Sequence, residues 1–376
     1  MRLLALLLLV SPLSYTNGQG IDLGGGVTTR VDVETYADLA LDIRDFREFL
    51  EAGNSDAALN LYVDGKNAQL KPGIKLSLQD VAHSLAAIPA KDSTPIFIYQ
   101  LWGLSNRDLT EISTNSQYAN NYALSAISST PDYAADGLIA LHLWIYAAHV
   151  LFKGVEICGK LTVADNPLAF DLAGGGMDEF IATWIGHDQI PASVDGHGLY
   201  SMTQRIGDLF AKNDPEAQVN TNLKLLYQEG AAALSFPNAC SKKNPYTYGQ
   251  LWNVAQRIVS QMYIPLMQLL IDALWAQDVD SIRIYATAIV PQISQCKASL
   301  FKRLKEELLG AAVTFSKTAD IVEDLQSAYD CLGFTCSDIG TYRVDQVAAC
   351  ADIPANLPIA EYVPTTFVND VSRIES

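Results

Sequence analysis

One predicted helix carries the side chains best suited to chemistry. His142, Tyr146, His149 and Lys153 are spaced by four, three and four residues, which places them on one face of a helix over residues 132–158. Two imidazoles and a phenol on one face can hold a metal ion or an anion inside a helical bundle. A stripe of this kind also occurs where polar side chains face solvent or hydrogen-bond to one another. The spacing leaves both interpretations open.

A second candidate follows three consecutive glycines at residues 174–176. Asp178 and Glu179 open the next predicted helix, and carboxylates there can coordinate a hard cation. Acidic residues are also common in a first helical turn because the helix dipole stabilises them. His187 follows this helix, and four of the five histidines lie between positions 142 and 197. This clustering favours a metal site.

Motifs of common catalytic sites are missing from the sequence. It contains no Gly-x-Ser-x-Gly, no His-Glu-x-x-His and no phosphate-binding loop. The glycine triplet lacks the preceding strand that a dinucleotide-binding turn requires. We therefore expect a protein that is not an enzyme.

Apolar residues recur at three- and four-residue steps along most of the chain, which predicts an all-α fold of helical bundles. Strand signals are weak, with one short apolar run at residues 96–99. Pro265 lies within a strongly helical pattern, and we expect it to kink that helix rather than end it. The predicted helices span residues 33–50, 56–63, 78–88, 116–127, 132–158, 177–185, 199–211, 215–234, 248–277, 279–309, 318–331 and 344–351.

The chain divides into five predicted segments. A loop over residues 172–176, rich in glycine, suggests a boundary between two packed bundles, and three prolines after residue 353 suggest an extended tail. The segments are a signal peptide (1–18), a flexible linker (19–30), an N-terminal bundle (31–172), a C-terminal bundle (173–351) and a Pro-rich tail (352–376).

Composition excludes two classes of protein. The 376 residues are 49% hydrophobic, which excludes a wholly disordered chain. With 42 acidic and 25 basic residues the net charge is −17, and no basic run exceeds Lys242-Lys243. Nucleic-acid binding requires basic residues against phosphate, so we expect no nucleic-acid partner.

The N-terminus predicts the compartment. Arg2 precedes an apolar run that is too short to span a bilayer, and small residues near Gly18 suit signal-peptide cleavage. The most apolar later stretch, residues 258–275, contains Pro265 and Asp272, so we interpret it as a buried helix rather than a membrane anchor. We expect a secreted or periplasmic protein at the cell surface that does not span a membrane.

Six cysteines fit an oxidising compartment and allow up to three disulfides. The sequence contains no Cys-x-x-Cys pair, so the spacing of the cysteines does not indicate a zinc site. We expect Cys331, Cys336 and Cys350 to link the C-terminal region locally, with buried free thiols as the alternative.

Several blocks of the sequence resemble the algal low-iron-inducible periplasmic, or iron-assimilating, protein family. They include Asp178 to Ala182 followed by Gly186, and the segments 57–67, 198–200, 219–220, 285–291 with Cys296, and 329–340. A more distant similarity is to imelysin-like helical bundles. The resemblance implies a secreted helical protein linked to iron uptake. In the family pattern a histidine stands three residues before the Asp–Glu pair, where this chain has Gly175 and where His187 is a candidate substitute.

We therefore expect ferric iron, or a small iron complex, to bind at a site that supports iron assimilation. Ferric iron prefers carboxylate and phenolate oxygens, with imidazole as a supplement. The expected ligands are Asp178, Glu179, Tyr146 and His149, followed by His142 and His187. The alternative is an extracellular structural protein, with a cell-wall partner and no metal.

Overall fold

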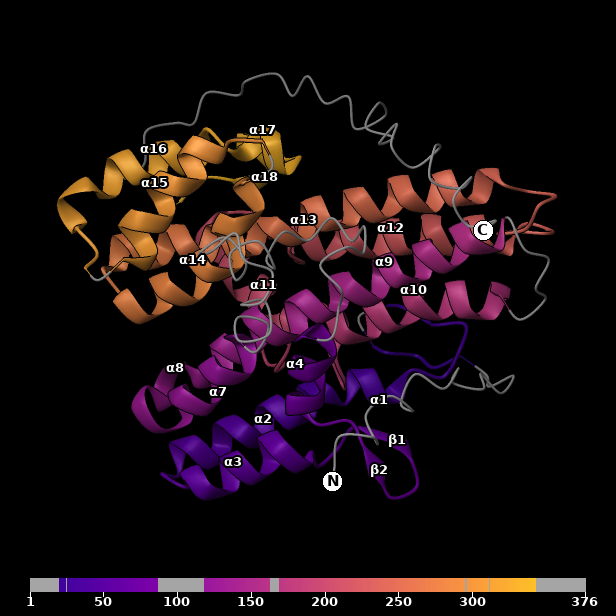
Figure 1. The fold of residues 1–376 in the computed structure, drawn as a ribbon, viewed down its shortest axis with the longest axis horizontal. Coiled ribbons are helices and arrows are strands. Elements are labelled where there is room, and N and C mark those ends of the chain that lie inside the picture. The colour runs from indigo at the N-terminus through magenta and orange to yellow at the C-terminus, as the bar shows by residue number, and fades with distance from the viewer. Residues whose placement is uncertain are drawn as a thin grey trace, which may run out of the picture.

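The computed structural model describes residues 20–24, 26–86, 118–162, 169–294, 296–310 and 312–342. Most of these residues are helical, and the predicted all-α fold is confirmed (Figure 1). The elements are α1 (Glu34–Ala37), α2 (Leu39–Glu51), α3 (Ser55–Asp64), β1 (Gln69–Lys71), β2 (Ile74–Lys75), α4 (Leu78–Ala86), α7 (Tyr118–Ser129), α8 (Pro131–Leu138), the π-helical turn η3 (Ile139–Leu143), α9 (Trp144–Leu161), α10 (Ala169–Ile185), α11 (Leu199–Leu209), α12 (Gln218–Ser235), α13 (Tyr246–Ala276), α14 (Val279–Ile293), α15 (Ala298–Leu309), the 3-10 turn η4 (Phe315–Lys317), α16 (Thr318–Gln326), α17 (Tyr329–Leu332) and α18 (Cys336–Ile339).

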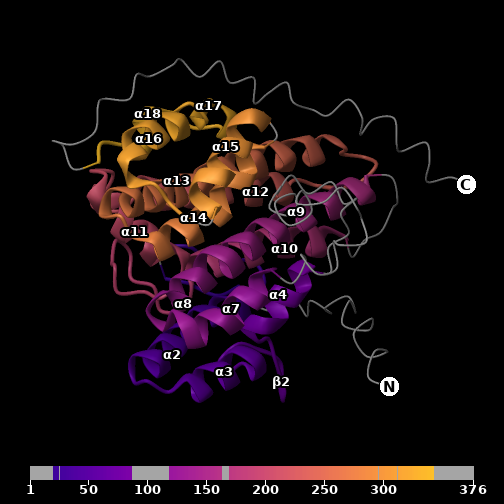
Figure 2. The same cartoon turned by 60° about the vertical axis from the view of Figure 1, so that its left-hand side comes forward.

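Four long helices, α9, α10, α12 and α13, pack side by side through the middle of the molecule. The helices α1 to α4, with α7 and α8, lie on one side of them, and α14 to α18 lie on the other, as both views show (Figures 1 and 2). Buried apolar side chains from Leu23 to Tyr342 form one continuous core across the described residues. The core thus places α9 and α10, which carry most of the candidate site residues, at the centre of the fold.

The glycine triplet lies inside α10, and the loop predicted at residues 172–176 is wrong. A side chain at Gly176 would lie 2.6 Å from the carbonyl oxygen of Val150 and 2.7 Å from the Cα of Gly154. A side chain at Gly154 would lie 2.8 Å from the carbonyl oxygen of Ala173. The glycines therefore let the backbones of α9 and α10 touch. The boundary predicted between residues 172 and 173 falls within this helix.

We expect Gly176→Ala to lower the free energy of unfolding by about 1–3 kcal/mol, because the added methyl group must push two packed helices apart. Gly249→Ala is the matched control: this glycine also lies in a helix, but no atom is within 4 Å of the added methyl. There the same change should raise stability slightly, since alanine favours helix over glycine. Thermal unfolding followed by circular dichroism measures both. Equal stability of the two variants would contradict the close helix contact.

Three predicted helices are interrupted in the structure. The segment 33–50 divides into α1 and α2, 279–309 into α14 and α15, and 318–331 into α16 and α17. The second gap covers residues 294–297, which is close to one helical turn. The apolar pattern therefore resumes nearly in phase after the gap, and periodicity does not reveal the break. Helix α13 continues through Pro265, as predicted.

The described part of the predicted linker is folded onto the core. Leu23 and Val27 are buried, and the Leu23 amide donates to the Val27 carbonyl over 3.0 Å. The flexible linker predicted for residues 19–30 is therefore wrong where the structure describes it. The predicted signal peptide, the apolar run 96–99, the helix 344–351 and the Pro-rich tail 352–376 lie outside the described residues.

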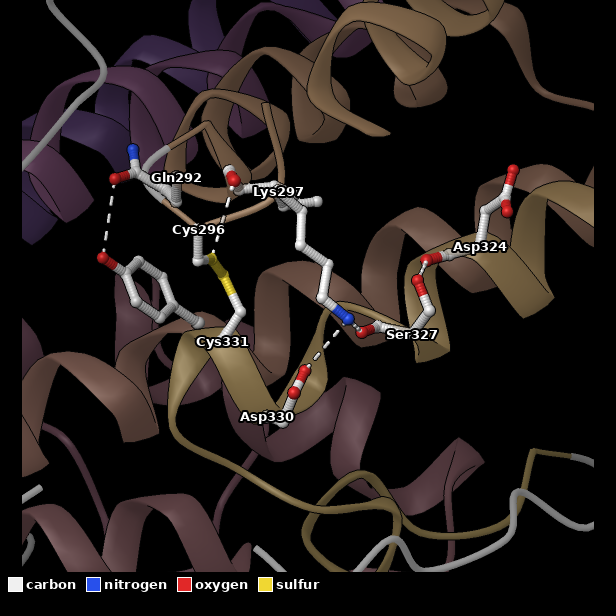
Figure 3. Close-up of a disulfide and its surroundings, with 9 residues drawn as sticks. Gln292, Cys296, Lys297, Asp324, Ser327, Asp330 and Cys331 are labelled. Atoms are coloured by element: carbon white, nitrogen blue, oxygen red, sulfur yellow. Dashed lines mark hydrogen bonds and ion pairs between the residues drawn. A yellow bond between two sulfur atoms is a disulfide. The ribbon is translucent and has the colours of Figure 1, made fainter. Parts of the chain in front are cut away.

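Disulfides join distant parts of the described chain. Cys158 at the end of α9 is bonded to Cys240 in the loop between α12 and α13, with 4.7 Å between their Cα atoms. Cys296 is bonded to Cys331 in α17, and beside it Lys297 pairs with Asp330 at 3.3 Å (Figure 3). Cys336 is disulfide-bonded as well. Disulfide formation is confirmed, and Cys331 pairs with Cys296, a cysteine that lies outside the group expected to link the C-terminal region locally.

Candidate metal centre

The predicted polar stripe lies on one continuous helical segment formed by α8, η3 and α9. The π-helical turn η3 contains His142, and Tyr146 and His149 follow in α9. A π-helical turn costs regular hydrogen bonding, and such turns often occur at functional sites. Both α9 and η3 pack against α4, on the N-terminal side of the molecule.

His142 is completely buried against a tyrosine. Its Nε2 atom is 3.3 Å from the hydroxyl of Tyr62, which donates to the Asn120 side chain over 3.0 Å. Within the described part of the chain its Nδ1 atom has no hydrogen-bond partner. Burial disfavours the charged imidazolium and lowers the pKa of His142 to about 3. The imidazole is therefore neutral at physiological pH.

We expect His142 to make the fold acid-sensitive. Its pKa is 6.5 when unperturbed and about 3 in the folded protein, so the unfolded chain binds more protons between these values. The free energy of unfolding should fall as pH decreases from about 6.5 towards 3, by on the order of 4 kcal/mol from this residue. In urea titrations across this range, His142→Gln should flatten the pH dependence. An unchanged slope would contradict the assignment.

Tyr146 lies against Tyr36, which in turn contacts a carboxylate from a third helix. Its ring stacks on that of Tyr36 in α1, with 6.3 Å between ring centroids and 25° between planes. Burial, and then the charge of Glu179 together with a hydrogen bond to that carboxylate, raise the pKa of Tyr36 well above its usual value of 10.0. Tyr36, Tyr146 and Glu179 are all buried. Two phenols and a carboxylate thus meet in the core; we call them, with His149, the phenol–carboxylate cluster.

The packing of α9 on α10 determines which residues of the two helices lie opposite one another in this cluster. Val150 and Gly154 lie against Gly176 and Ala173 respectively, so the two helices run antiparallel. One turn further along, Tyr146 comes level with Glu179. His149 is one turn from Tyr146 on the same face of α9.

His149 completes the cluster as a nitrogen donor. Its Nδ1 atom is buried and, among the described residues, has no hydrogen-bond partner. Burial, assisted by the charge of Lys153, lowers the pKa of His149 to about 4. A neutral imidazole with an unsatisfied buried nitrogen can accept a metal ion, which the charged form cannot.

Asp178 is hydrogen-bonded to groups outside the cluster. Its Oδ2 atom accepts hydrogen bonds from the backbone amides of Arg30 (3.0 Å) and Val31 (3.1 Å). Its Oδ1 atom accepts the hydroxyl of Tyr227 over 2.7 Å. These contacts fasten the N-terminal segment to α10 and α12. They favour a structural role for Asp178.

His187 is held outside the cluster by two carboxylates. Its Nδ1 atom lies 2.6 Å from Asp38 and its Nε2 atom 3.2 Å from Asp188. Its backbone amide also donates to the carbonyl of Ala37 over 3.1 Å. Both ring nitrogens therefore have partners, and His187 fastens the end of α10 to α1.

Of the six residues expected to bind metal, Tyr146 and Glu179 both lie beside Tyr36, and His149 lies one turn from Tyr146 on the same face of α9. Tyr36, in the predicted helix 33–50, was not among the expected ligands. Within the described ranges, no group of three or more histidine, cysteine, aspartate or glutamate side chains is arranged to hold a metal ion. Any metal at this place therefore needs the two tyrosines as ligands.

The sequence and the fold were compared with known proteins. No protein-family profile, no curated protein and no solved structure matches the chain. The resemblance to iron-assimilating proteins accordingly stays a prediction.

Two helical segments, Pro131–Leu161 and Tyr246–Ala276, are long and apolar enough to cross a membrane by length and composition. Most of each segment is buried within the protein, and core helices of soluble proteins meet the same criteria.

Proposed function

We propose that the protein binds ferric iron, or a small iron complex, at the phenol–carboxylate cluster and supports iron assimilation at the cell surface. The observation that carries the proposal is that Tyr36 lies against both Tyr146 and Glu179, while His149, with an unsatisfied Nδ1 atom, lies one turn from Tyr146 on α9. Two phenolates, one carboxylate and one imidazole form a donor set dominated by hard oxygen, which ferric iron prefers over softer ligands.

The charge of the protein supports the capture of a cation. The chain carries a net charge of −17, which raises the concentration of cations near the surface. At the cluster itself, iron must displace the protons of both phenols. Burial raises the pKa of Tyr36, so loading should release protons and weaken as the solution is acidified.

Metal analysis of protein secreted by its own host, followed by ferric titration of the metal-free protein, tests the proposal. We expect one iron per chain and a visible tyrosinate-to-iron charge-transfer band that rises in parallel with binding. Zinc and calcium should compete poorly, because neither matches a phenolate-rich site. A protein that takes up no iron in the titration would refute the proposal and favour the structural, cell-wall-associated alternative.

A further inference from the structure

The loop between α12 and α13 has an unusual charge for this protein. No aspartate or glutamate occurs from Gly230 to Ile271, although acidic residues make up 42 of the 376 residues. The same stretch contains Lys242, Lys243 and Arg257. Arg257 is neutralised by Glu229 at 2.8 Å, whereas both lysines are exposed and form no ion pair within the described part of the protein. The loop therefore forms a small basic patch on the surface of an acidic protein.

The same loop exposes two aromatic side chains. Phe236 is 57% exposed and Tyr246 is 81% exposed, and they are the only aromatic residues among the exposed large hydrophobic side chains of the described chain. They stand at the two ends of the loop, immediately after α12 and at the first residue of α13. Exposed aromatics next to lysines are typical of surfaces that contact the membrane–water interface.

The loop is held in a fixed shape. The buried disulfide between Cys158 and Cys240 ties it to the end of α9, and the amide of Asn244 donates to the carbonyl of Ser241 over 2.9 Å. This hydrogen bond closes a turn with Lys242 and Lys243 at its two central positions. A surface that is ordered before binding loses less entropy when it binds.

The end of α9 lies at the same end of the molecule, but its exposed lysine is neutralised. Lys160 is exposed two residues after Cys158, and it pairs with Glu156 at 2.5 Å. Figure 1 shows this end of α9 next to the α12–α13 loop, at the opposite side of the molecule from α15. We call the exposed residues Phe236, Lys242, Lys243 and Tyr246 the α12–α13 tip.

We propose that the α12–α13 tip docks the protein onto an anionic lipid surface. The lysines attract the negative headgroups, and the two aromatic rings enter the interface between headgroups and acyl chains. Contact through a projecting loop end keeps the acidic body farther from the membrane, where its repulsion is screened beyond about 8 Å at physiological salt. This inference does not depend on iron binding, because none of its residues belongs to the phenol–carboxylate cluster.

Sedimentation of the full-length secreted protein with vesicles tests the inference. Binding should be strong to vesicles of phosphatidylcholine with phosphatidylglycerol, weak to phosphatidylcholine alone, and reduced by salt. Lys242→Gln/Lys243→Gln should reduce the partition coefficient about thirtyfold, since each lysine near the surface contributes about fivefold. Phe236→Ser/Tyr246→Ser should reduce it at least about tenfold, since it removes the groups that enter the interface.

Matched variants elsewhere on the surface separate the contribution of the tip to membrane binding from that of charge and exposed apolar surface in general. Lys302→Gln/Lys305→Gln on α15 removes the same charge, and Leu225→Ser removes a 59% exposed apolar side chain on α12. Both should bind like the wild type. Equal binding of the tip variants and these controls would overturn the inference. So would binding to a soluble anionic polysaccharide that survives Phe236→Ser/Tyr246→Ser, because a polymer, not a bilayer, would then be the partner.

Discussion

The double substitution Tyr36→Phe/Tyr146→Phe should abolish the visible iron band and ferric binding together. Both phenols are buried in the phenol–carboxylate cluster, and each change removes one oxygen while leaving the stacked rings in place. Glu179→Gln keeps the size of the side chain but removes its charge, and it should weaken ferric affinity by at least about a hundredfold. Ferric titration followed by visible absorption measures both effects, with circular dichroism to verify that the helices remain.

Tyr263→Phe is the matched control for the tyrosine changes. Tyr263 is buried as well, but its ring packs on Trp144 and its hydroxyl reaches Gln292 over 3.5 Å, on the C-terminal side of the molecule. This variant should bind iron with unaltered affinity and an unaltered band. Binding that persists in Tyr36→Phe/Tyr146→Phe would contradict the assignment of the two phenols as ligands.

Asp178→Ala should destabilise the fold severely, by about 3–5 kcal/mol. The change leaves the amides of Arg30 and Val31 and the buried hydroxyl of Tyr227 without their acceptor, where the carboxylate is itself fully buried. Asp178→Asn keeps one acceptor oxygen, so its free energy of unfolding should fall by less. Urea unfolding measures the difference, and Glu51→Ala, at an exposed acid on α2, should stay within about 0.5 kcal/mol of the wild type.

The same variants distinguish a structural carboxylate from a metal ligand. If Asp178 only fastens the N-terminal segment to α10 and α12, folded Asp178→Asn should bind ferric iron as tightly as the wild type. If instead its stability is normal and its iron affinity is lost, Asp178 is a ligand and the hydrogen bonds described above are not its principal role.

Local patterns in the sequence predicted much of the helical framework. The periodic stripe placed His142, Tyr146 and His149 on one helix, and the predicted helices 33–50 and 56–63 left a short break between them. In the structure Gly53 has a positive φ of 71°, and the Asn54 side chain accepts the amide of Ala57 over 3.1 Å at the start of α3. These features depend on neighbours within one or two turns, which a single sequence contains.

Contacts between distant segments could not be predicted from these local patterns. The glycines at 174–176 have the composition of a loop, and only the closeness of α9 shows why a helix needs them there. Asp178 meets amides 147 and 148 residues earlier in the chain. Tyr36 belonged to an apolar pattern, and nothing in its spacing indicated that Glu179 would lie beside its hydroxyl. The sequence signal that could have identified Tyr36 is a tyrosine at a predicted buried position, but buried tyrosines are common in cores for other reasons.

The most direct test of the central claim is an anomalous-scattering map, recorded at the iron absorption edge from crystals loaded with ferric ion. We expect one strong peak within coordination distance of the side-chain oxygens of Tyr36, Tyr146 and Glu179, with His149 completing the ligand set. A peak at Asp178 or His187, or crystals that hold no iron after loading, would contradict it.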